Sequence, residues 1–233
     1  ATKAGVDIKT DVTNDSDTEA TGVSVKSTVY NKEGDVVSTQ TDDITVAAGK
    51  TETISQSVDV ANPKLWSVDS PNLYWVRTEI IQNGKVVDST DSRFGIRYIA
   101  TDPNSGFYLN GVHTKLNGVC EHSDLGSLGM ETYQAAVDRR IRTLKKYGVN
   151  AIRTSHNPVS PEFIEACDRL GMLVFEEAFD QWLYSKNSDD YHNYFNKAAD
   201  GKTVVFDKAG NDNTNNDTSY IEVKRDDLQS NAE

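Results

Sequence analysis

One stretch of the chain, residues 150–182, constrains the fold more than any other, because two short apolar segments flank an amphipathic one. Residues 150–154 read Asn-Ala-Ile-Arg-Thr and are typical of a short strand. Ser160 can cap a helix that has Pro161 at its first position, where a missing N–H costs nothing. Met172–Phe175 is a continuous apolar run, as in a strand buried on both faces of a parallel sheet. The stretch therefore predicts a strand–helix–strand unit.

Polar side chains gather where the two predicted strands end. Parallel α/β folds place their chemistry at the carboxyl ends of strands, so this placement indicates an enzyme. The residues concerned are Arg153, His156, Asn157, Glu176, Glu177, Asp180 and Trp182.

Composition excludes some classes of partner. The formal net charge of −12 argues against nucleic acid or an anionic membrane as a partner. No apolar run is long enough to span a bilayer. The chain begins with Ala1 and no signal-type segment opens it, which leaves a missing or removed upstream part open. The compartment also stays open, with an extracellular or cell-surface bacterial location slightly favoured.

The two cysteines, Cys120 and Cys167, fall on a predicted strand and a predicted helix. Neither lies in a pattern typical of a thiol nucleophile or a zinc site. A disulfide stays open, but we expect both to be buried thiols that pack as small hydrophobic side chains.

The first part of the sequence, up to about residue 97, predicts an all-β domain. Asn83-Gly84 is a strong hairpin signal between residues 73–82 and 85–89. Several short strands over this length suggest an immunoglobulin-like sandwich, in which Trp66, Tyr74 and Trp75 pack rather than bind sugar. Alternating apolar and polar residues predict further strands at residues 6–12, 23–29 and 54–58.

The remainder changes to a β-α-β-α-β order, which favours a parallel sheet with crossover helices. After a hairpin at residues 106–112, a strand at 115–120 ends in Glu121-His122-Ser123-Asp124. Residues 131–147 carry a helical apolar stripe. Beyond Trp182 the pattern weakens. We expect an ordered loop or short helix at 190–195 and a mobile polar segment at 211–217. A brief strand at 219–223 and the start of a helix at 226–233 are also expected. A loop this long in an α/β enzyme usually forms a wall or lid of the active site.

Several motifs occur in the same order as in one enzyme family. They are Pro63-Lys-Leu-Trp-Ser-Val-Asp-Ser-Pro-Asn-Leu-Tyr74, Phe94-Gly-Ile-Arg97, Leu116-Asn-Gly-Val-Cys-Glu-His-Ser-Asp124, Asn150-Ala-Ile-Arg-Thr-Ser-His-Asn-Pro158 and Cys167-Asp-Arg-Leu-Gly-Met-Leu-Val-Phe-Glu-Glu-Ala-Phe-Asp180. With them the chain resembles glycoside hydrolase family 2, the group of β-galactosidases, β-glucuronidases and β-mannosidases. The Glu-Glu-Ala-Phe-Asp form together with Cys-Glu-His resembles bacterial β-galactosidases of the larger, multidomain type.

The resemblance implies a multi-domain fold: an all-β immunoglobulin-like sandwich over residues 1–97, then the N-terminal portion of a (β/α)8 TIM barrel over residues 98–233. That portion comprises the first three βα units plus a long loop, whereas a whole barrel takes about 250 residues. The family's general acid/base is a Glu in an Asn-Glu pair that ends the fourth strand, and its nucleophile is a Glu that ends the seventh. No Asn-Glu pair follows Trp182, and the usual amino-terminal jelly roll is missing. We therefore expect a fragment without the catalytic glutamates.

The strand-end residues have sugar-binding roles by this resemblance. Retaining hydrolysis needs two carboxyl groups about 5–5.5 Å apart, and adjacent strand residues such as Glu176 and Glu177 point to opposite faces, so they cannot form that pair. His122 and Asp124 match positions that line the substrate subsite, although capping of its own loop is an equal alternative for Asp124. We expect Arg153 to be buried with a carboxylate partner, orienting a missing catalytic glutamate.

Two further pairs complete the predicted site. His156 and Asn157 are substrate-side candidates, with an ordinary loop role as the lesser alternative. Asp180 offers a carboxylate for sugar hydroxyls, and Trp182 offers an aromatic platform, with packing as its alternative. No cofactor is predicted. The four histidines show no metal-ligand spacing, although the resemblance leaves magnesium or sodium possible.

The combined prediction is a β-galactosidase-type glycosidase that hydrolyses terminal non-reducing β-D-galactosides with retention, the isolated chain being inactive. The alternatives are a β-glucuronidase or β-mannosidase of the same family, or a non-catalytic carbohydrate-binding or structural module. The expected partner is a β-glycoside substrate. An incomplete barrel exposes a strand edge and apolar helix faces, so a homo-oligomer or a complementing chain is also expected.

Overall fold

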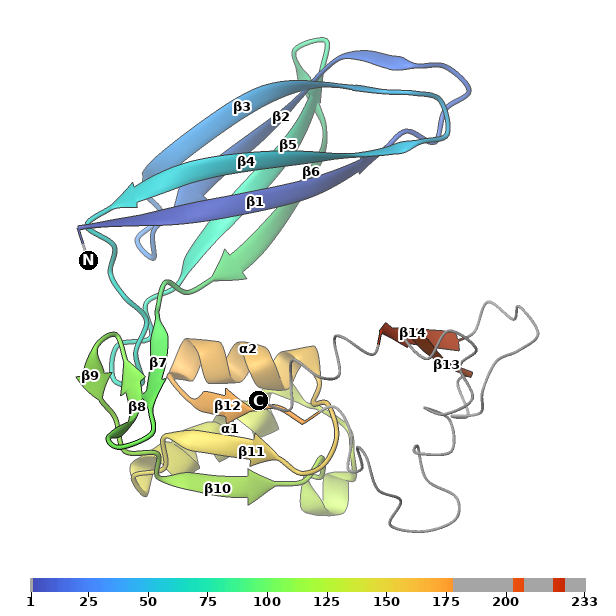
Figure 1. Ribbon diagram of the computed structural model, residues 1–233. Coiled ribbons are helices and arrows are strands. Elements are labelled where there is room, and N and C mark those ends of the chain that lie inside the picture. The colour runs from blue at the N-terminus through green and yellow to red at the C-terminus, as the bar shows by residue number, and fades with distance from the viewer. Residues whose placement is uncertain (1, 178–202, 208–219, 225–233) are drawn as a thin grey trace. The chain divides into compact units, whose positions relative to one another are not determined.

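The computed structural model describes residues 2–177 and the backbone of 203–207 and 220–224 (Figure 1). The chain divides into two compact units, each described by itself. The first contains Ala1–Leu116 with Cys167–Met172, and the second contains Asn117–Ala166 with Leu173–Glu233.

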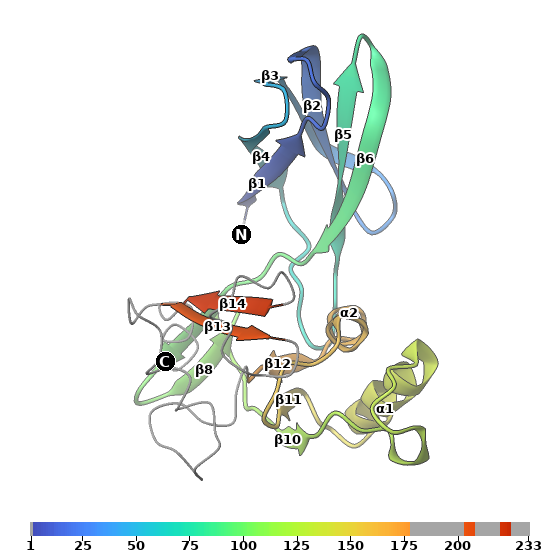
Figure 2. The ribbon, with the colours of Figure 1, turned by 90° about the vertical axis from the view of Figure 1, so that its right-hand side faces the viewer.

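Two antiparallel sheets make up most of the first unit (Figures 1 and 2). One sheet pairs β1 with β4, and the other has the order β3-β2-β5-β6. The strands are β1 (Lys3–Thr13), β2 (Ala20–Tyr30), β3 (Val36–Val46), β4 (Thr51–Ala61), β5 (Tyr74–Gln82) and β6 (Lys85–Phe94). The alternation-based strands and the Asn83-Gly84 hairpin are confirmed. Our reading missed β3, whose apolar residues lie mainly at its two ends.

The core of this unit lies between the two sheets. Ile8, Val58 and Val60 come from β1 and β4 and pack with Val29 and Val76 of the other sheet. Removing such side chains from water stabilises the fold by roughly 1.5–3 kcal/mol each. The predicted sandwich is therefore confirmed, while its finer assignment to the immunoglobulin-like class stays a prediction.

A buried glutamine ties the sheets together within that core. Gln56 of β4 accepts a hydrogen bond from Ser27 Oγ of β2 at 2.6 Å. Its amide nitrogen donates to the carbonyl of Val25 at 3.0 Å and to Oδ2 of Asp42 at 2.9 Å. Because each polar atom of the Gln56 side chain has a partner, its burial costs little and fixes the facing of the two sheets.

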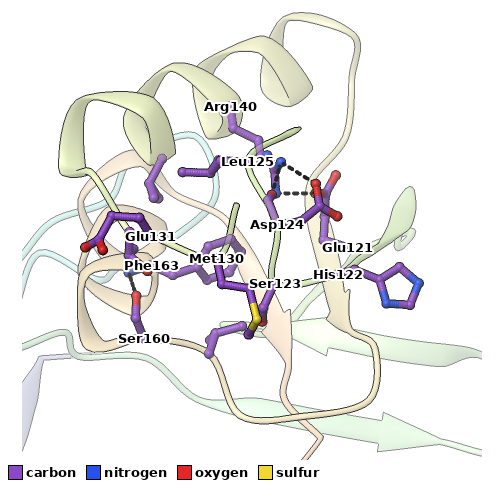
Figure 3. A pocket seen from close by; sticks show the side chains of 13 residues that line it. Glu121, His122, Ser123, Asp124, Leu125, Met130, Glu131, Arg140, Ser160 and Phe163 are labelled. Atoms are coloured by element: carbon purple, nitrogen blue, oxygen red, sulfur yellow. Dashed lines mark hydrogen bonds and ion pairs between the residues drawn. The ribbon is translucent and has the colours of Figure 1, made fainter. Parts of the chain in front are cut away.

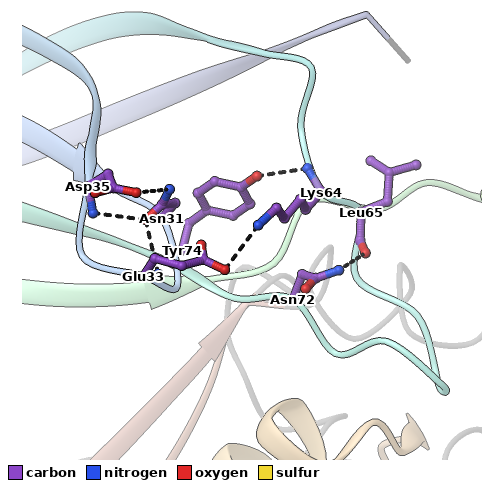
Figure 4. Close-up of polar contacts among 7 residues, drawn as sticks. All are labelled: Asn31, Glu33, Asp35, Lys64, Leu65, Asn72 and Tyr74. Carbon is purple, nitrogen blue, oxygen red and sulfur yellow. Dashed lines mark hydrogen bonds and ion pairs between the residues drawn. The ribbon is translucent and has the colours of Figure 1, made fainter.

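The segment between β4 and β5 is held by polar contacts at the tip of Tyr74 (Figure 4). The backbone N–H of Lys64 donates to the Tyr74 hydroxyl at 2.8 Å, and Lys64 Nζ lies 3.0 Å from a carboxylate oxygen of Glu33. Asn72 donates to the carbonyl of Leu65 at 3.0 Å. These hydrogen bonds and the ion pair therefore fix the path of the segment between β4 and β5.

Trp66 in this segment is almost fully buried and is a packing residue, as predicted. Its indole N–H donates to the carbonyl of Asp168 at 2.8 Å, and the guanidinium of Arg97 lies 4.7 Å from the ring centroid. Trp75 likewise stacks on Tyr30, with ring centroids 5.8 Å apart. The first unit ends in a small sheet of β7 (Ile99–Asp102), β8 (Gly106–Leu109) and β9 (Val112–His113), which contains the predicted second hairpin.

The second unit is built on a three-stranded parallel sheet with the order β10-β11-β12. Its elements in chain order are β10 (Gly118–Glu121), the short 3-10 helix η1 (Gly126–Leu128), α1 (Gln134–Lys146), β11 (Ala151–Thr154), α2 (Pro161–Leu170) and β12 (Leu173–Phe175). The predicted strand–helix–strand unit is confirmed. Ser160 Oγ accepts from the N–H of Phe163 at 3.3 Å, and Gly171 has a φ of 77° where α2 ends.

The sheet presents different rows of side chains on its two faces. Ile152 of β11 is completely buried. The aligned residues Cys120, Arg153 and Phe175 share the other face, because they are register partners and side chains alternate along a strand. Phe175 is 65% exposed, so this face is open within the described residues.

Two further strands, β13 (Thr203–Asp207) and β14 (Tyr220–Lys224), pair antiparallel. The second confirms the strand expected at 219–223, and the first was not predicted. Our expectations for residues 190–195, 211–217 and 226–233 concern segments outside the described residues. No helix in the described part of the chain is long and apolar enough to cross a membrane.

Candidate active site

The carboxyl ends of β10 and β11 bring two predicted histidines together. Glu121 and Thr154 are register partners at these ends, and the N–H of Ser155 donates to the carbonyl of Glu121 at 2.9 Å. The next residues of each strand therefore leave the sheet side by side. The rings of His122 and His156 meet edge to face, with centroids 6.2 Å apart and an interplanar angle of 66°.

Asn157 connects the same two loops. Its side-chain nitrogen donates to Ser123 Oγ at 2.8 Å and to the carbonyl of Pro158 at 2.7 Å. The loop after β11 is thereby held against the loop after β10. With the amide nitrogen of Asn157 engaged, its carbonyl oxygen is the atom that can accept a further hydrogen bond.

Arg153 has a carboxylate partner, as we expected, but it is less buried than we predicted, and its orienting of a catalytic glutamate stays a prediction. Its Nε lies 2.6 Å from Oε1 of Glu177, just past the end of β12. The Arg153 side chain is 41% exposed, so the expectation of a buried guanidinium is wrong for this chain. The open face of the three-stranded sheet is the reason. The backbone N–H of Glu177 also donates to Thr154 Oγ1 at 2.9 Å, which fixes the main chain at Glu177 beside β11.

The prediction of two buried structural thiols holds for Cys167 and is wrong for Cys120. Both are free, but Cys120 is exposed on the open face of the sheet. Arg153 Nη1 lies 3.6 Å from its sulfur. The Arg153 guanidinium, and after it Ser155, lowers the pKa of the Cys120 thiol by stabilising the thiolate. Burial instead raises the pKa of Cys167 to about 12.

Asp124 makes the contacts of a loop-capping residue (Figure 3). Its Oδ1 accepts from the N–H of Gly126 at 3.1 Å, and its side chain is 60% exposed. Arg140 of α1 donates to the main-chain carbonyl of Asp124 and lies 2.9 Å from a carboxylate oxygen of Glu121. These contacts agree with the capping alternative, and a sugar contact of Asp124 stays a prediction.

Arg140 and its ion pair with Glu121 are features that our sequence reasoning missed. The position of Arg140 gave a usable signal: it flanks the buried stripe of Val137 and Ile141 on α1, where a long side chain can reach across a sheet edge. The carboxylate that Arg140 contacts is set by the path of the loop after β10. The sequence of that loop has no regular apolar periodicity from which its path could be predicted.

A small hollow lies between this loop and the two helices (Figure 3). Its volume is about 40 Å³, which suits one or a few water molecules. Ligand pockets are typically about 300–1,000 Å³. The hollow is therefore too small for a sugar ring, although His122 is among the residues that line it. The ring of His122 points away from the hollow.

Two of the predicted site residues, Asp180 and Trp182, lie outside the described residues. Among the residues that the structure does describe, no group of three or more His, Cys, Asp or Glu side chains is arranged to hold a metal ion.

Together these features define a class: a β-sandwich followed by the opening βα units of a barrel, with polar side chains converging at the carboxyl ends of its strands. Comparison with known families agrees. The sequence model of "Glycosyl hydrolases family 2" matches residues 1–97, and that of "Glycosyl hydrolases family 2, TIM barrel domain" matches residues 101–218. The chain belongs to glycoside hydrolase family 2.

Individual relatives include both galactosidases and glucuronidases. The chain is 40% identical over 195 residues to the β-galactosidase BoGH2A of Bacteroides ovatus, covering 84% of this chain and 23% of the relative. It is 43% identical over 137 residues to a putative β-glucuronidase of Formosa agariphila, covering 59% of this chain and 13% of that one.

Solved structures of the family resemble the fold. A family 2 member from Bacteroides cellulosilyticus superposes with a TM-score of 0.75 at 38% identity, over 84% of this chain and 25% of that one. A Bacteroides uniformis β-glucuronidase superposes with a TM-score of 0.73 at 31% identity, over 80% and 22%. The chain thus spans about a quarter or less of the length of these relatives.

Proposed function

We propose that this chain is the sandwich and opening barrel segment of a retaining β-galactosidase that removes terminal non-reducing β-D-galactosyl groups. The observation that carries the proposal is the meeting of His122 and His156 at the carboxyl ends of adjacent parallel strands. Strand ends of this kind are where β/α barrels place their substrate contacts.

In this proposal the histidine pair and Asn157 bind hydroxyls of the terminal sugar. Neutral imidazoles each supply one donor and one acceptor, and the Asn157 carbonyl oxygen supplies another acceptor. Asp180 would accept from further hydroxyls, and Trp182 would cover an apolar sugar face. A pyranose presents several hydroxyls that both donate and accept, so a site of mixed donors and acceptors suits it better than a cationic one.

The preference for a galactoside over a glucuronide rests on charge. A glucuronide carries a carboxylate, which arginine recognises well. At the described strand ends, Arg153 is paired with Glu177 and Arg140 with Glu121. Both guanidinium charges are thus already compensated by carboxylates of the chain, which leaves neither as a ready anchor for a uronate.

The same ion pairs argue that catalysis needs residues beyond those of this chain. A retaining mechanism uses one carboxyl group as nucleophile and another as acid/base, about 5–5.5 Å apart. Glu121 and Glu177 are each engaged in an ion pair with an arginine of the chain, Arg140 and Arg153 respectively, so neither carboxylate is free to take one of these roles. We therefore propose that the chain alone has no turnover and that the two catalytic glutamates lie elsewhere in the complete enzyme.

The test compares the 233-residue chain with the protein encoded by the complete reading frame. Each is assayed with 4-nitrophenyl β-D-galactoside, β-D-glucuronide and β-D-mannoside. We expect hydrolysis of the galactoside by the complete protein and none by the chain. Turnover by the chain, or a preference of the complete protein for the glucuronide or mannoside, would contradict the proposal.

A substitution series in the complete protein tests the site itself. His156→Ala should lower kcat/KM for the galactoside about tenfold or more, because a buried sugar hydroxyl loses its partner. His113→Ala is the matched control, since His113 lies in β9 and packs against Tyr108. Equal activity of the two variants would show that the histidine pair does not contact the substrate.

A further inference from the structure

The outer edge of β1 is an unpaired strand edge in the described sandwich. Among the strands that the structure describes, β1 is hydrogen-bonded to β4 alone. The N–H of Asn62 donates to the carbonyl of Thr2, and that of Asn14 donates to the carbonyl of Lys50, both at 2.9 Å. These bonds continue the β1–β4 register, so the even-numbered residues of β1 bond to β4. The odd-numbered residues consequently point their N–H and C=O groups outward.

This edge is also regular along its whole length. Its register with β4 runs through all eleven residues of β1 without a shift. β6, the edge of the larger sheet on that side, has an irregular register at Ile80/Ile81 and uses the N–H of Ser89 to bind Asp88. Bulges and local side-chain bonds spoil an edge for pairing, whereas a long straight edge is a template for another strand.

The charges along β1 are complementary to themselves. When a second copy of β1 is laid antiparallel so that Ile8 faces Ile8, all eleven residues pair and Asp7 faces Lys9 twice. The odd-numbered residues then face each other and can exchange their outward N–H and C=O bonds. A shift of the centre by one residue places Asp7 against Asp7 or Lys9 against Lys9. Opposed like charges destabilise a strand pair, so the centred register is favoured.

The inner side of the same edge offers apolar surface. Val6 and Ile8 of β1 line a groove of about 510 Å³ that runs towards β6 and includes Val76 and Phe94. Pairing centred on Ile8 would bring the second copy's Val6 and Ile8 to this border. Apolar side chains would then continue from one inner face to the other.

We propose that the β1 edge is a homodimer interface, in which two copies pair antiparallel about Ile8 to form a continuous sheet β4-β1-β1-β4. The contact is the same patch on both copies, so it closes at two chains and uses up the free edge. This inference stands apart from the proposed glycosidase activity, because it rests on the sandwich alone.

The experiment measures the mass of the 233-residue chain by sedimentation velocity and light scattering across about 1–100 μM, a span suited to weak dimers. We expect a concentration-dependent dimer. Lys9→Glu turns both attractive pairs into repulsive ones and should weaken dimerisation about tenfold or more. The double variant Asp7→Lys/Lys9→Asp restores opposite charges across the pair and should restore the dimer. Lys32→Glu, in an exposed turn, is the control with the same charge change.

A second variant prevents pairing of the two β1 strands through the backbone instead of through charge. Lys9→Pro removes an outward N–H and leaves the β1–β4 bonds in place, since proline is tolerated on a solvent-facing edge. It should give a monomer with an unchanged far-UV circular dichroism spectrum. A wild-type chain that is monomeric throughout would overturn the proposal. So would a dimer that survives both Lys9→Glu and Lys9→Pro, or a charge swap that fails to restore dimerisation.

Discussion

Arg153 Nε lies 2.6 Å from Glu177 Oε1, and this ion pair links the carboxyl ends of β11 and β12. The two residues are far apart in sequence and are adjacent only because the strands are parallel neighbours. The Arg153 guanidinium also contacts the sulfur of Cys120 in β10, the remaining strand of the sheet. One side chain thus connects all three strands of the sheet at the end where the substrate contacts are proposed.

Glu177→Gln should destabilise the chain by about 1 kcal/mol. The substitution removes the charge of the partner and leaves the Arg153 guanidinium uncompensated, but that side chain is 41% exposed and solvent screens much of the loss. Urea unfolding followed by circular dichroism measures the effect. The neighbouring Glu176 is exposed, so Glu176→Gln should change stability by less than about 0.5 kcal/mol. Equal effects of the two variants would contradict the role given to the pair.

The two thiols should differ widely in reactivity. Alkylation needs the thiolate, so its rate rises with pH through the thiol pKa. The lowered pKa of Cys120 moves that rise to a lower pH than for an ordinary cysteine, whereas the pKa of about 12 keeps buried Cys167 unreactive until the chain unfolds. Iodoacetamide labelling at several pH values, with the labelled site read by mass spectrometry, checks this order.

Arg153→Gln tests the cause of that difference. It removes the cation that contributes most to lowering the Cys120 pKa, so the labelling curve should move to higher pH and labelling at neutral pH should slow. Lys64→Gln, which removes a cation from the sandwich, is the control and should leave the curve in place. An unchanged curve for Arg153→Gln would show that the guanidinium does not act on the thiol.

Gln56→Glu should make stability strongly dependent on pH. The new carboxyl group would be buried and close to Asp42, whose Oδ2 now accepts from Gln56 Nε2 at 2.9 Å. Burial and a like charge both raise the folded-state pKa above the unfolded one. The variant should therefore match the wild type at a pH below the unfolded Glu pKa. It should lose about 3 kcal/mol as the pH rises through the folded pKa. Urea midpoints at about pH 4 and pH 7 measure the change, with Gln40→Glu as a less buried comparison.

Trp66→Phe should destabilise the first unit although the new ring is still apolar. The indole N–H bond to the Asp168 carbonyl is lost, which leaves a partly buried acceptor without its donor, at a cost of about 1–3 kcal/mol. Part of the ring volume is lost as well. Thermal unfolding measures the shift. Trp75→Phe is the comparison, because Trp75 stacks on Tyr30 at a less buried position and should cost less.

The elements of this chain were largely predictable from local sequence. The Asn83-Gly84 turn, the Ser160 cap with Pro161 and the glycine after α2 each act within a few residues, so they can be identified without knowing the fold. The start of α1 was less well predicted. Residues 131–133 continue the helical pattern, but α1 begins only at Gln134. β3 was missed because apolar alternation is weak along its middle.

The sequence by itself determined that polar residues follow three strand ends, and the order of motifs determined the family to which the chain belongs. Only the tertiary structure decided which of these residues meet: His122 with His156, Arg153 with Glu177, and Arg140 with Glu121. It also decided that Cys120 is exposed while Cys167 is buried. The physical reason is range. Turns, caps and alternation are local consequences of backbone and side-chain geometry, whereas ion pairs and exposure depend on strand register and on what covers each face of a sheet.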